Sequence, residues 1–553
     1  MSKVLSSIAA VAAAALIAAP ALAADNIPHL QDHGTARQLV VDGKPFLILG
    51  GELSNSAASS LDYLQSTWPT LKSVGLNTVI APVEWDQVEP QQGKYDFAVV
   101  DGMIKQARQN KVKLVLLWFG AWKNSMSTYA PAYVKHDYAT YSKAQDDKGQ
   151  PQDILSPFDP DTLKADAAAY AALLGHLKQT DTEHTVITVQ VENEIGMLPV
   201  VRDYSPQAQA AYDGPVPAAL IAYLKVHHTT LNPYVRTLWE ARGAKESGTW
   251  HEVFGDSTEA QEVFQAWYFA QFANELTRAG KAAYPIPAYV NVALNRPGKA
   301  PGQYPSAGPL PHLFDVWKAG GPDIDFIAID MYFPDFTTWA DKFKRPDNPF
   351  FTPEANQAGK IEAGANAFYA IGQLDGISFS PFSIDNIKVD AGKGANSANL
   401  TQAYDVLTQL TPQILDAQGT GRMRGFRPKV SYDGIVDETP QSFVLGGYRF
   451  TVSFVDPWIP KDQQTIAANG GLIIQTGDDS FIVAGNGIVV TFEDAAMANK
   501  MAVGIEQAVE GRYVGGVWKP GRWLNGDEIH QGRHVKISAG NFGIQQLKLY
   551  KFK

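Results

Sequence analysis

The chain has 553 residues, of which 45% are hydrophobic. This is more apolar material than one core normally uses, so about two or three domains are expected. Its 46 basic and 57 acidic residues give a formal charge of -11, which repels phosphate backbones and argues against a nucleic-acid partner. Because the chain has no cysteine, disulfides and a thiol nucleophile are excluded, and stability must come from packed cores.

The first residues have the layout of a secretory signal. Lys3 precedes a largely apolar, alanine-rich run to Ile17, and small residues follow before Ala24. We expect residues 1–23 to be removed. A membrane-anchoring helix is the alternative, which the shortness of the run and Pro20 weaken. The sequence therefore predicts export to the bacterial periplasm or the cell exterior, with no membrane span after cleavage.

Between about residues 40 and 390, short apolar runs alternate with longer stretches of helical spacing, a pattern typical of parallel strands with helical crossovers. The expected strands are 46–50, 78–83, 113–118, 186–191, 287–293, 326–331, 349–353 and 376–379. Two of the expected helices are 59–74 and 161–179, and Asp161 can cap the second one. Eight strands predict a closed (β/α)8 TIM barrel over residues 24–420. An open doubly wound sheet is the alternative, but no glycine-rich phosphate turn follows the first run.

After about residue 425 the pattern changes to brief alternating segments separated by glycine and asparagine turns. The expected strands are 448–454, 471–475, 481–484, 487–492 and 534–538. They predict an all-β antiparallel sandwich over residues 421–553. Trp518 and Trp523 in this region could serve as sugar platforms, but core packing or support of the barrel is the interpretation that we favour.

Two glutamates follow apolar runs, Glu194 after the fourth and Glu354 after the seventh. In a (β/α) barrel, catalytic groups sit at the carboxyl ends of the strands. Cleavage of a glycosidic bond needs one carboxylic acid to protonate the leaving oxygen and a second carboxylate, about 5 to 5.5 Å away in a retaining enzyme. The pair therefore predicts glycoside hydrolysis. Its separation of 160 positions (354 minus 194) matches the acid on strand four and the nucleophile on strand seven of a retaining barrel enzyme.

Residues next to Glu194 are assigned from strand periodicity. Alternation places Gln190, Glu192 and Glu194 on one face, pointing into the barrel, and only Glu194 lies at the mouth. We therefore interpret Glu192 as a structural or supporting polar group. Asn193 suits a donor to the sugar 2-hydroxyl, a hydrogen bond that strengthens in the transition state.

Residues 189–196, Val-Gln-Val-Glu-Asn-Glu-Ile-Gly, resemble the Val-Gln-Val-Glu-Asn-Glu-Tyr-Gly motif of glycoside hydrolase family 35, the β-galactosidases. Residues 85–90 and 93–97, Trp-Asp-Gln-Val-Glu-Pro and Gly-Lys-Tyr-Asp-Phe, are similar to the family block that follows strand two. The resemblance covers most of the barrel region. It implies a retaining mechanism in which Glu194 is the acid/base and Glu354 the nucleophile.

The chain also departs from the family pattern. Ala121 stands where many members place a glutamate that holds galactose, and residues 50–55, Gly-Gly-Glu-Leu-Ser-Asn, replace the usual Gly-Ser-Ile-His-Tyr. The outer hydroxyls of the sugar must therefore be held differently. The chain more closely resembles a bacterial branch in which Gly-Gly-Glu-Leu, Trp-Lys-Asn-Ser (here 122–125) and a C-terminal β-domain occur together.

Further substrate-binding candidates follow from side-chain chemistry and from the resemblance. Trp118 and Trp122 offer flat faces that stack on sugars, although Trp118 could equally be barrel packing. Tyr332 resembles the family tyrosine that bonds the nucleophile and would keep it ionised. Asn124 and Glu52 are candidate partners of sugar hydroxyls.

Other chemistries are not indicated. His227 and His228 are neighbours that cannot share a helix face, and the sequence has no His-Glu-x-x-His motif, so no metal site is expected. The Gly-x-Ser-x-Gly turn of esterases is also absent. No cofactor is implied.

The sequence thus predicts an exported retaining exo-β-glycosidase, in the first place a β-galactosidase that releases terminal galactose from oligo- or polysaccharides. Alternatives are a retaining arabinopyranosidase, fucosidase or glucosidase, or a non-catalytic carbohydrate-binding protein. In each case the partner is a carbohydrate. The sequence gives no oligomeric state.

Overall fold

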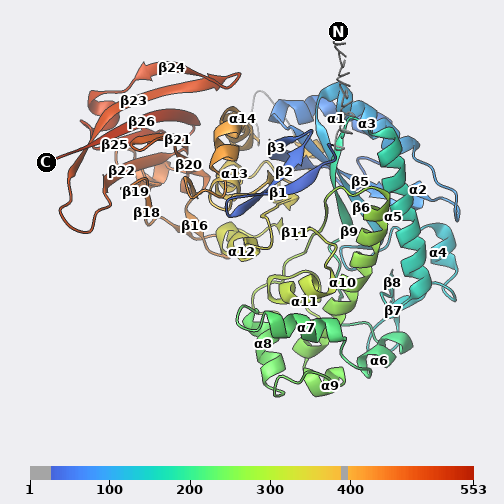
Figure 1. Ribbon diagram of the computed structural model, residues 1–553. Coiled ribbons are helices and arrows are strands. Elements are labelled where there is room, and N and C mark those ends of the chain that lie inside the picture. Colours follow the sequence, from blue (N-terminus) through green and yellow to red (C-terminus); the bar gives the residue numbers. More distant parts are fainter. Residues whose placement is uncertain (1–25, 388–396) are drawn as a thin grey trace, which may run out of the picture.

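The computed structural model describes residues 26–387 and 397–553, so the predicted secretory signal at 1–23 lies outside the described residues. A barrel of parallel strands stands beside a domain of antiparallel sheets, and helices α13 (Ala363–Gly372) and α14 (Ala398–Ala417) lie between them (Figure 1). Within the described ranges, no helix is both long and apolar enough to span a bilayer.

The barrel wall is built from strands that follow one another in sequence. Seven of them form one parallel sheet in the order β11-β10-β9-β6-β5-β4-β14, and β12 and β13 form a separate parallel pair. Their bounds are β4 (Ile48–Glu52), β5 (Thr78–Glu84), β6 (Lys113–Lys123), β9 (Val186–Asn193), β10 (Ala288–Val290), β11 (Phe326–Ile327), β12 (Asp330–Met331), β13 (Glu354–Ala355) and β14 (Ser378–Phe379). Sequential order with a helical crossover between strands is the topology of a (β/α) barrel.

The segment that contains β13 closes the wall between β11 and β14. The Ile329 N–H donates to the Phe351 carbonyl (3.2 Å), and the Ile377 N–H donates to the Phe350 carbonyl (3.0 Å). In the described part of the chain, all eight predicted runs therefore contribute to the wall. The prediction of a TIM barrel is confirmed, and the alternative of an open doubly wound sheet is wrong.

The barrel interior is a packed apolar core. Its buried members are Leu39, Val41, Ile48, Ile80, Val115, Leu117, Phe119, Ile187, Tyr289, Phe326, Ala328, Phe351 and Ile377. Leu39 and Val41 come from an antiparallel sheet of β1 (His29–His33), β2 (Ala36–Val41) and β3 (Lys44–Phe46), which precedes the barrel. This small sheet therefore plugs one end of the interior.

Helices cover the outside of the wall (Figure 1). The principal ones are α1 (Leu61–Val74), α3 (Ala98–Asn110), α5 (Pro160–Thr180), α10 (Thr258–Ala283), α11 (Phe314–Gly320) and α12 (Phe336–Phe343), besides α13 and α14. Shorter ones are α2 (Trp85–Val88), α4 (Ala132–His136), α6 (Pro206–Tyr212), α7 (Ala218–Val226), α8 (Pro233–Glu240) and α9 (Trp250–Val253). Helices α6 to α9 form an insertion between β9 and α10, at the bottom of the molecule in Figure 1.

Helix α5 begins with a different cap from the one predicted. Asp159, and not Asp161, accepts the free N–H groups of the first turn, those of Asp161 (2.9 Å) and Thr162 (3.0 Å). Pro160 occupies the first helical position, where its missing N–H costs nothing, so the cap falls one residue before it.

The C-terminal domain is an antiparallel sandwich, as predicted. Its six-stranded sheet has the order β15 (Met423–Phe426), β20 (Gly470–Gln475), β21 (Ser480–Asn486), β26 (Gly543–Phe552), β23 (Ala502–Val514) and β24 (Val517–Trp523). Its four-stranded sheet has the order β18 (Gln441–Leu445), β19 (Tyr448–Ser453), β22 (Ile488–Asp494) and β25 (His534–Ile537). The same domain contains the pair of β16 (Lys429–Val430) and β17 (Val436–Asp437). Another pair, β7 (Lys143–Gln145) with β8 (Pro151–Leu155), lies in the barrel region between β6 and α5.

The six-stranded sheet packs on both of its faces. Leu472, Ile474, Ile482 and Ile544 on one face belong to the same apolar cluster as α13 and α14 of the barrel. Ile473, Phe481, Val483 and Leu547 on the other face form the sandwich core with the four-stranded sheet. Trp518 also packs against the barrel cluster, whereas Trp523 is 66% exposed. The boundary predicted at 420/421 lies in the turn between α14 and β15.

Tyr404 of α14 ties the first and last strands of the barrel together. Its buried hydroxyl lies 2.8 Å from the Gly50 carbonyl of β4 and 2.7 Å from the Phe379 carbonyl of β14. Removing the hydroxyl leaves both buried carbonyls without this donor. We expect Tyr404→Phe to lower the free energy of unfolding by about 1 to 3 kcal/mol, measured by urea denaturation.

The control is Tyr138→Phe, because the Tyr138 side chain is largely exposed. This variant should leave the denaturation midpoint unchanged. Equal midpoints for the two variants would contradict the role given to Tyr404.

Candidate active site

Glu194 and Glu354 lie together at the carboxyl-terminal mouth of the barrel. Glu194 is the first residue after β9, and Glu354 opens β13. Their exposed fractions are 6% and 5%, so both carboxyl groups are almost enclosed. One carboxylate oxygen of each, together with one of Asp330 on β12, lies within 4.8 Å of the others. The two glutamates that the sequence singles out therefore meet in space.

A left-handed turn at the end of β9 orients Glu194. Glu192 and Glu194 have φ angles of 60° and 46°, in a region that residues other than glycine rarely adopt. Two hydrogen bonds hold the turn, since the Glu194 N–H donates to Asn291 Oδ1 (2.9 Å) and Ser125 Oγ donates to the Glu194 carbonyl (2.9 Å). Backbone in this region persists only where its surroundings enforce it, and it concentrates at functional sites.

The same turn changes the direction of Glu192. The prediction that Glu192 points into the barrel with Glu194 is wrong, because the positive φ breaks the strand alternation. Its carboxylate instead accepts the N–H groups of Ala121 (3.1 Å) and Trp122 (2.9 Å). It is also hydrogen-bonded to Asp166 of α5, a helix that covers the wall. Glu192 therefore supports the end of β6, which agrees with its interpretation as a structural group.

Asn291, just after β10, connects the functional groups of β9 and β12. Its Nδ2 donates to Asp330 Oδ2 (2.6 Å) and to Asn193 Oδ1 (3.2 Å). Asn193 Oδ1 also accepts from Gln190 Nε2 (3.0 Å), so the amide orientation of Asn193 is fixed. Asn193 Nδ2 is buried without a partner among the described residues. Because buried donors are nearly always paired, this one is suited to a ligand hydroxyl.

The Tyr332 hydroxyl donates to Glu354 Oε1, which is the contact that the family resemblance implies. Burial raises the pKa of Glu354, whereas the charge of Lys123 and the hydrogen bonds from Tyr332 and Glu52 lower it. Every one of these partners favours the ionised form of Glu354 against desolvation.

The surroundings of Glu194 favour its protonated form more strongly than those of Glu354 do. Burial, followed by the negative charge of Glu354, raises its pKa to about 7, and Lys123, Asp330 and Asn124 oppose the shift. Asn124 Nδ2 donates to Glu194 Oε2, so this predicted hydroxyl partner contacts the carboxylate directly. A carboxyl group with such a pKa is partly protonated at neutral pH.

Two more buried acids surround the pair. Burial first, and then the charges of neighbouring carboxylates, raise the pKa of Glu52 and of Asp330 well above the ordinary range. Glu52 is hydrogen-bonded to Glu354, and Asp330 to Glu194. Both are therefore held as neutral acids that donate to the two central glutamates.

Glu194, Asp330 and Glu354 are also the carboxylates that could together hold a cation, since their oxygens are close enough to share one. No such role is expected from the sequence. Carboxylates in contact through shared protons serve acid and base chemistry without an ion.

The structure contradicts the two tryptophan assignments. Trp118 and Trp122 have exposed fractions of 0%, so neither can stack on a sugar. Trp118 Nε1 donates to Asp166 Oδ1 (2.8 Å), and Trp122 Nε1 donates to the Leu155 carbonyl (3.1 Å). The physical reason is the length of β6, which continues to Lys123 instead of ending at 118, so both rings remain in the packed wall.

Three residues of the site escaped the sequence assignment: Asp330, Asn291 and Lys123. Asp330 and Asn291 lie near the ends of predicted strands, where the rule of polar residues at strand ends could have selected them. Lys123 lies five residues beyond the predicted end of its strand. Its signal was hidden because an aromatic, apolar sequence masked the true end of β6.

The Glu192 and Asp166 pair makes stability depend on pH. Burial raises the pKa of Asp166 from its ordinary 3.8 to about 6. Since the folded state binds this proton more tightly, the contribution to stability is complete below pH 3.8 and is lost as pH rises through about 6. We expect Asp166→Asn to flatten the fall in unfolding free energy between acid and neutral pH by roughly 3 kcal/mol, measured by urea denaturation across that range.

Asp161→Asn, an exposed position on the same helix, is the control and should leave the pH dependence unchanged. If Asp166→Asn and the native chain lost stability in parallel as pH rises, the raised pKa of Asp166 would be contradicted.

Two segments of the chain match known families. Residues 60–277 match the glycoside hydrolase family 42 model, described as beta-galactosidase, and residues 400–536 match a domain of unknown function, DUF5597. The first segment contains Glu194 but not Glu354. The matching model is thus that of family 42 and not that of family 35, which the motif at 189–196 resembles.

A beta-galactosidase of Xanthomonas manihotis is 30% identical over 204 residues, which are 35% of this chain and 31% of that protein. The chain thus spans about a third of the length of this relative. Among solved structures, the beta-galactosidase of Rahnella sp. R3 has a TM-score of 0.46 at 18% identity, over 68% of this chain and 58% of the other. That of Bacillus circulans sp. alkalophilus has a TM-score of 0.44 at 15% identity, with the same coverage.

Proposed function

We propose that this protein is a retaining exo-β-glycosidase that releases terminal galactose from oligo- or polysaccharides. The observation that carries the proposal is the approach of Glu194 and Glu354, whose oxygens lie within 4.8 Å at the barrel mouth. Retaining glycosidases hold their carboxyl groups about 5 to 5.5 Å apart, whereas inverting enzymes need about 6.5 to 9.5 Å for an intervening water.

The mechanism has two displacements. Glu354 attacks the anomeric carbon and forms a covalent glycosyl ester, while the bond to the leaving oxygen breaks and Glu194 protonates that oxygen. Glu194, now a carboxylate, then takes a proton from water as the water attacks the anomeric carbon. Glu354 leaves as a carboxylate, and both groups return to their starting states.

The surroundings suit these roles. Hydrogen bonds from Tyr332 and Glu52 favour ionised Glu354, and burial beside that charge favours protonated Glu194. The unpaired Nδ2 of Asn193 supports its assignment as the donor to the sugar 2-hydroxyl. Glu52 lies in the segment that departs from the family 35 pattern. We assign it two contacts, one with the nucleophile Glu354 and one with the sugar hydroxyls beside it.

The choice of galactose rests on the segment at 60–277 and on the motif of family 35. Another retaining glycosidase, acting on arabinopyranose, fucose or glucose, remains the alternative within the same mechanism. A panel of nitrophenyl glycosides distinguishes them, and galactose should give the highest kcat/KM. Export to the periplasm or the cell exterior is also part of the proposal and rests on residues 1–23 alone.

Removing either central carboxyl group should abolish turnover. We expect Glu194→Gln and Glu354→Gln to lower kcat on a nitrophenyl β-galactoside by on the order of 10²-fold or more, with unchanged folding by circular dichroism. The matched control is Glu183→Gln, because Glu183 is an exposed glutamate just before β9 and should keep full activity.

If the two variants kept activity close to that of the control, the proposed mechanism would be contradicted. A non-catalytic binding protein would bind sugar equally well in all three variants and turn over none. For an active chain, nuclear magnetic resonance of the first product should show the β-anomer, and an α-anomer would contradict retention.

The pH profile should have an alkaline limb set by Glu194. Since Glu194 must be protonated to donate to the leaving oxygen, and burial beside Glu354 raises its pKa to about 7, kcat/KM should fall as pH rises through that value. The measurement is kcat/KM against pH with a nitrophenyl β-galactoside. A profile that stays flat well above that pH would exclude Glu194 as the acid.

A further inference from the structure

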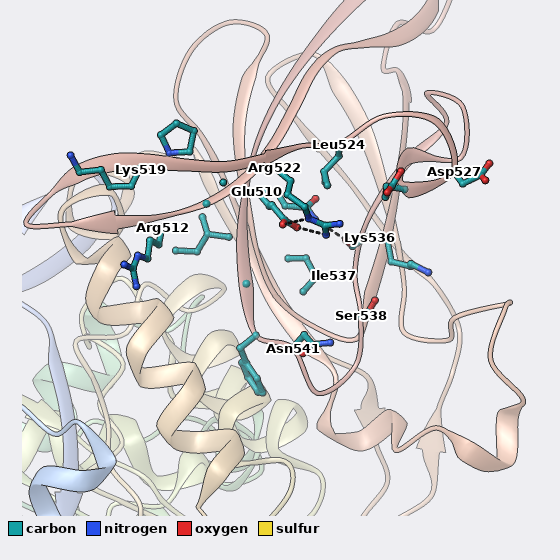
Figure 2. Close-up of a pocket in the computed structure, with 18 residues that line it drawn as sticks. Glu510, Arg512, Lys519, Arg522, Leu524, Asp527, Lys536, Ile537, Ser538 and Asn541 are labelled. Atoms are coloured by element: carbon teal, nitrogen blue, oxygen red, sulfur yellow. Dashed lines mark hydrogen bonds and ion pairs between the residues drawn. The ribbon is translucent and has the colours of Figure 1, made fainter.

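A large groove lies on the C-terminal sandwich (Figure 2). Its volume is about 1070 Å³, and its lining comes from residues 510 to 545 of strands β23 to β26 and their connections. Pockets for single drug-sized ligands have volumes of about 300 to 1,000 Å³, so this groove has room for a longer ligand. None of the residues of the candidate active site lines it.

The groove forms where the six-stranded sheet extends beyond the four-stranded sheet. Ala508 of β23 and Leu547 of β26 pair across the strands and face the sandwich core. Two residues further along the register, Glu510 pairs with Gln545 on the same face, and both line the open groove. The inner face is thus polar at the point where the second sheet no longer covers it.

A bulge extends this polar row to β24. The register of β23 and β24 shifts between Val509 and Gly511, and bulges of this kind re-aim side chains. Arg522 of β24 donates two hydrogen bonds to the Glu510 carboxylate, from Nε (2.5 Å) and from Nη2 (3.0 Å). Figure 2 shows this pair in the middle of the groove, with Arg512 and Lys519 toward one end and Asp527 toward the other.

Gln545 carries an acceptor that the protein leaves unused. Its side chain is 5% exposed, and its Nε2 donates to the Lys536 carbonyl (2.8 Å). Its Oε1 is buried and has no partner among the described residues. Because buried polar atoms are nearly always paired, an unpaired acceptor in the groove lining points to a donor supplied by a ligand.

The charges of the lining nearly cancel. Basic members are Arg512, Lys519, Arg522 and Lys536, and acidic members are Glu510, Asp527 and Glu528. Glu510 and Arg522 neutralise each other, and Lys536 is paired with Asp456 (3.1 Å). The groove therefore favours neither a polyanion nor a polycation. Its paired polar groups lie among apolar side chains such as Leu524 and Ile537, and together they match the hydroxyl edges and C–H faces of a sugar.

We propose that this groove binds a segment of a neutral oligo- or polysaccharide. Gln545 accepts a hydrogen bond from one sugar hydroxyl, and the pair of Glu510 and Arg522 bonds the neighbouring hydroxyls. The inference goes beyond the proposed hydrolysis, which enters only as the reason for preferring a glycan to other hydroxyl-rich ligands. A second sugar contact on the same chain would raise the local concentration of polymer ends at the barrel.

The test is affinity electrophoresis of the full chain carrying Glu354→Gln, which prevents turnover. The gels contain one of three soluble neutral polysaccharides: plant β-galactan, galactomannan or arabinan. Saturating free galactose blocks binding at the barrel mouth. At least one polysaccharide should retard the chain, and Gln545→Leu and Arg522→Ala should each raise its Kd by about ten-fold.

Arg449→Ala is the matched control, because Arg449 pairs with Glu493 on the other sheet, outside the groove. It should leave the retardation unchanged. Arg522 lies at the surface, so its variant decides the test even if Gln545→Leu does not fold. Retardation by none of the three polysaccharides, or equal retardation of Arg522→Ala and the control, would overturn the proposal.

Heparin provides the remaining comparison. Retardation that depends on Arg522 in heparin alone would identify a polyanion site and would also overturn the proposal. Hydrolysis of a nitrophenyl β-galactoside by Arg522→Ala, made in the otherwise native chain, should be unchanged. Absence of hydrolysis in the native chain would count against the proposed function and not against the groove.

Discussion

The barrel mouth depends on how much negative charge a buried site can hold. Glu52, Glu194, Asp330 and Glu354 lie together there, and Lys123 is the basic group that lowers the pKa of each of them. In water all four would be ionised at neutral pH, but desolvation and mutual repulsion favour neutral forms. Glu194 and Glu354 each receive two side-chain hydrogen bonds, but the charge of Glu354 also raises the pKa of Glu194. The two glutamates therefore differ in protonation because of their surroundings and not because of residue type.

Much of the fold could be predicted because the spacing of apolar residues within each short segment identifies that segment as a strand or a helix. Each of the eight barrel runs is a short apolar segment that needs only its own sequence to be recognised, and the same holds for the sandwich strands. Strand ends were less predictable, since the aromatic residues after 118 suit both a strand and a sugar platform. Only the packing of Trp118 against Asp166, which is distant in sequence, distinguishes the two.

The residues of the site likewise fall into those that could be predicted from the sequence and those that could not. Glu194 and Glu354 were predictable because each follows an apolar run. The orientation of Glu192 was not, because a positive φ reverses the alternation on which its assignment rested. The reoriented Glu192 carboxylate packs directly against Gly120, where a Cβ would lie only 2.6 Å from Glu192 Oε1. Asp330 is hydrogen-bonded to Glu194 and accepts a hydrogen bond from Asn291, and contacts of this kind between strands cannot be recognised from one strand alone.

The six-stranded sheet contributes one face to each of two apolar cores, and this affects how the chain comes apart. A layer shared in this way transmits disruption from either side, so the barrel and the sandwich should melt as one cooperative unit although composition divides them. The family match at 400–536 begins inside α14, before the compositional boundary, and α14 carries the hydroxyl that joins β4 to β14. The segment that matches the family model thus includes part of the barrel's own support, so exchanging residues 421–553 alone would leave the apolar residues of α13 and α14 without their native partner sheet.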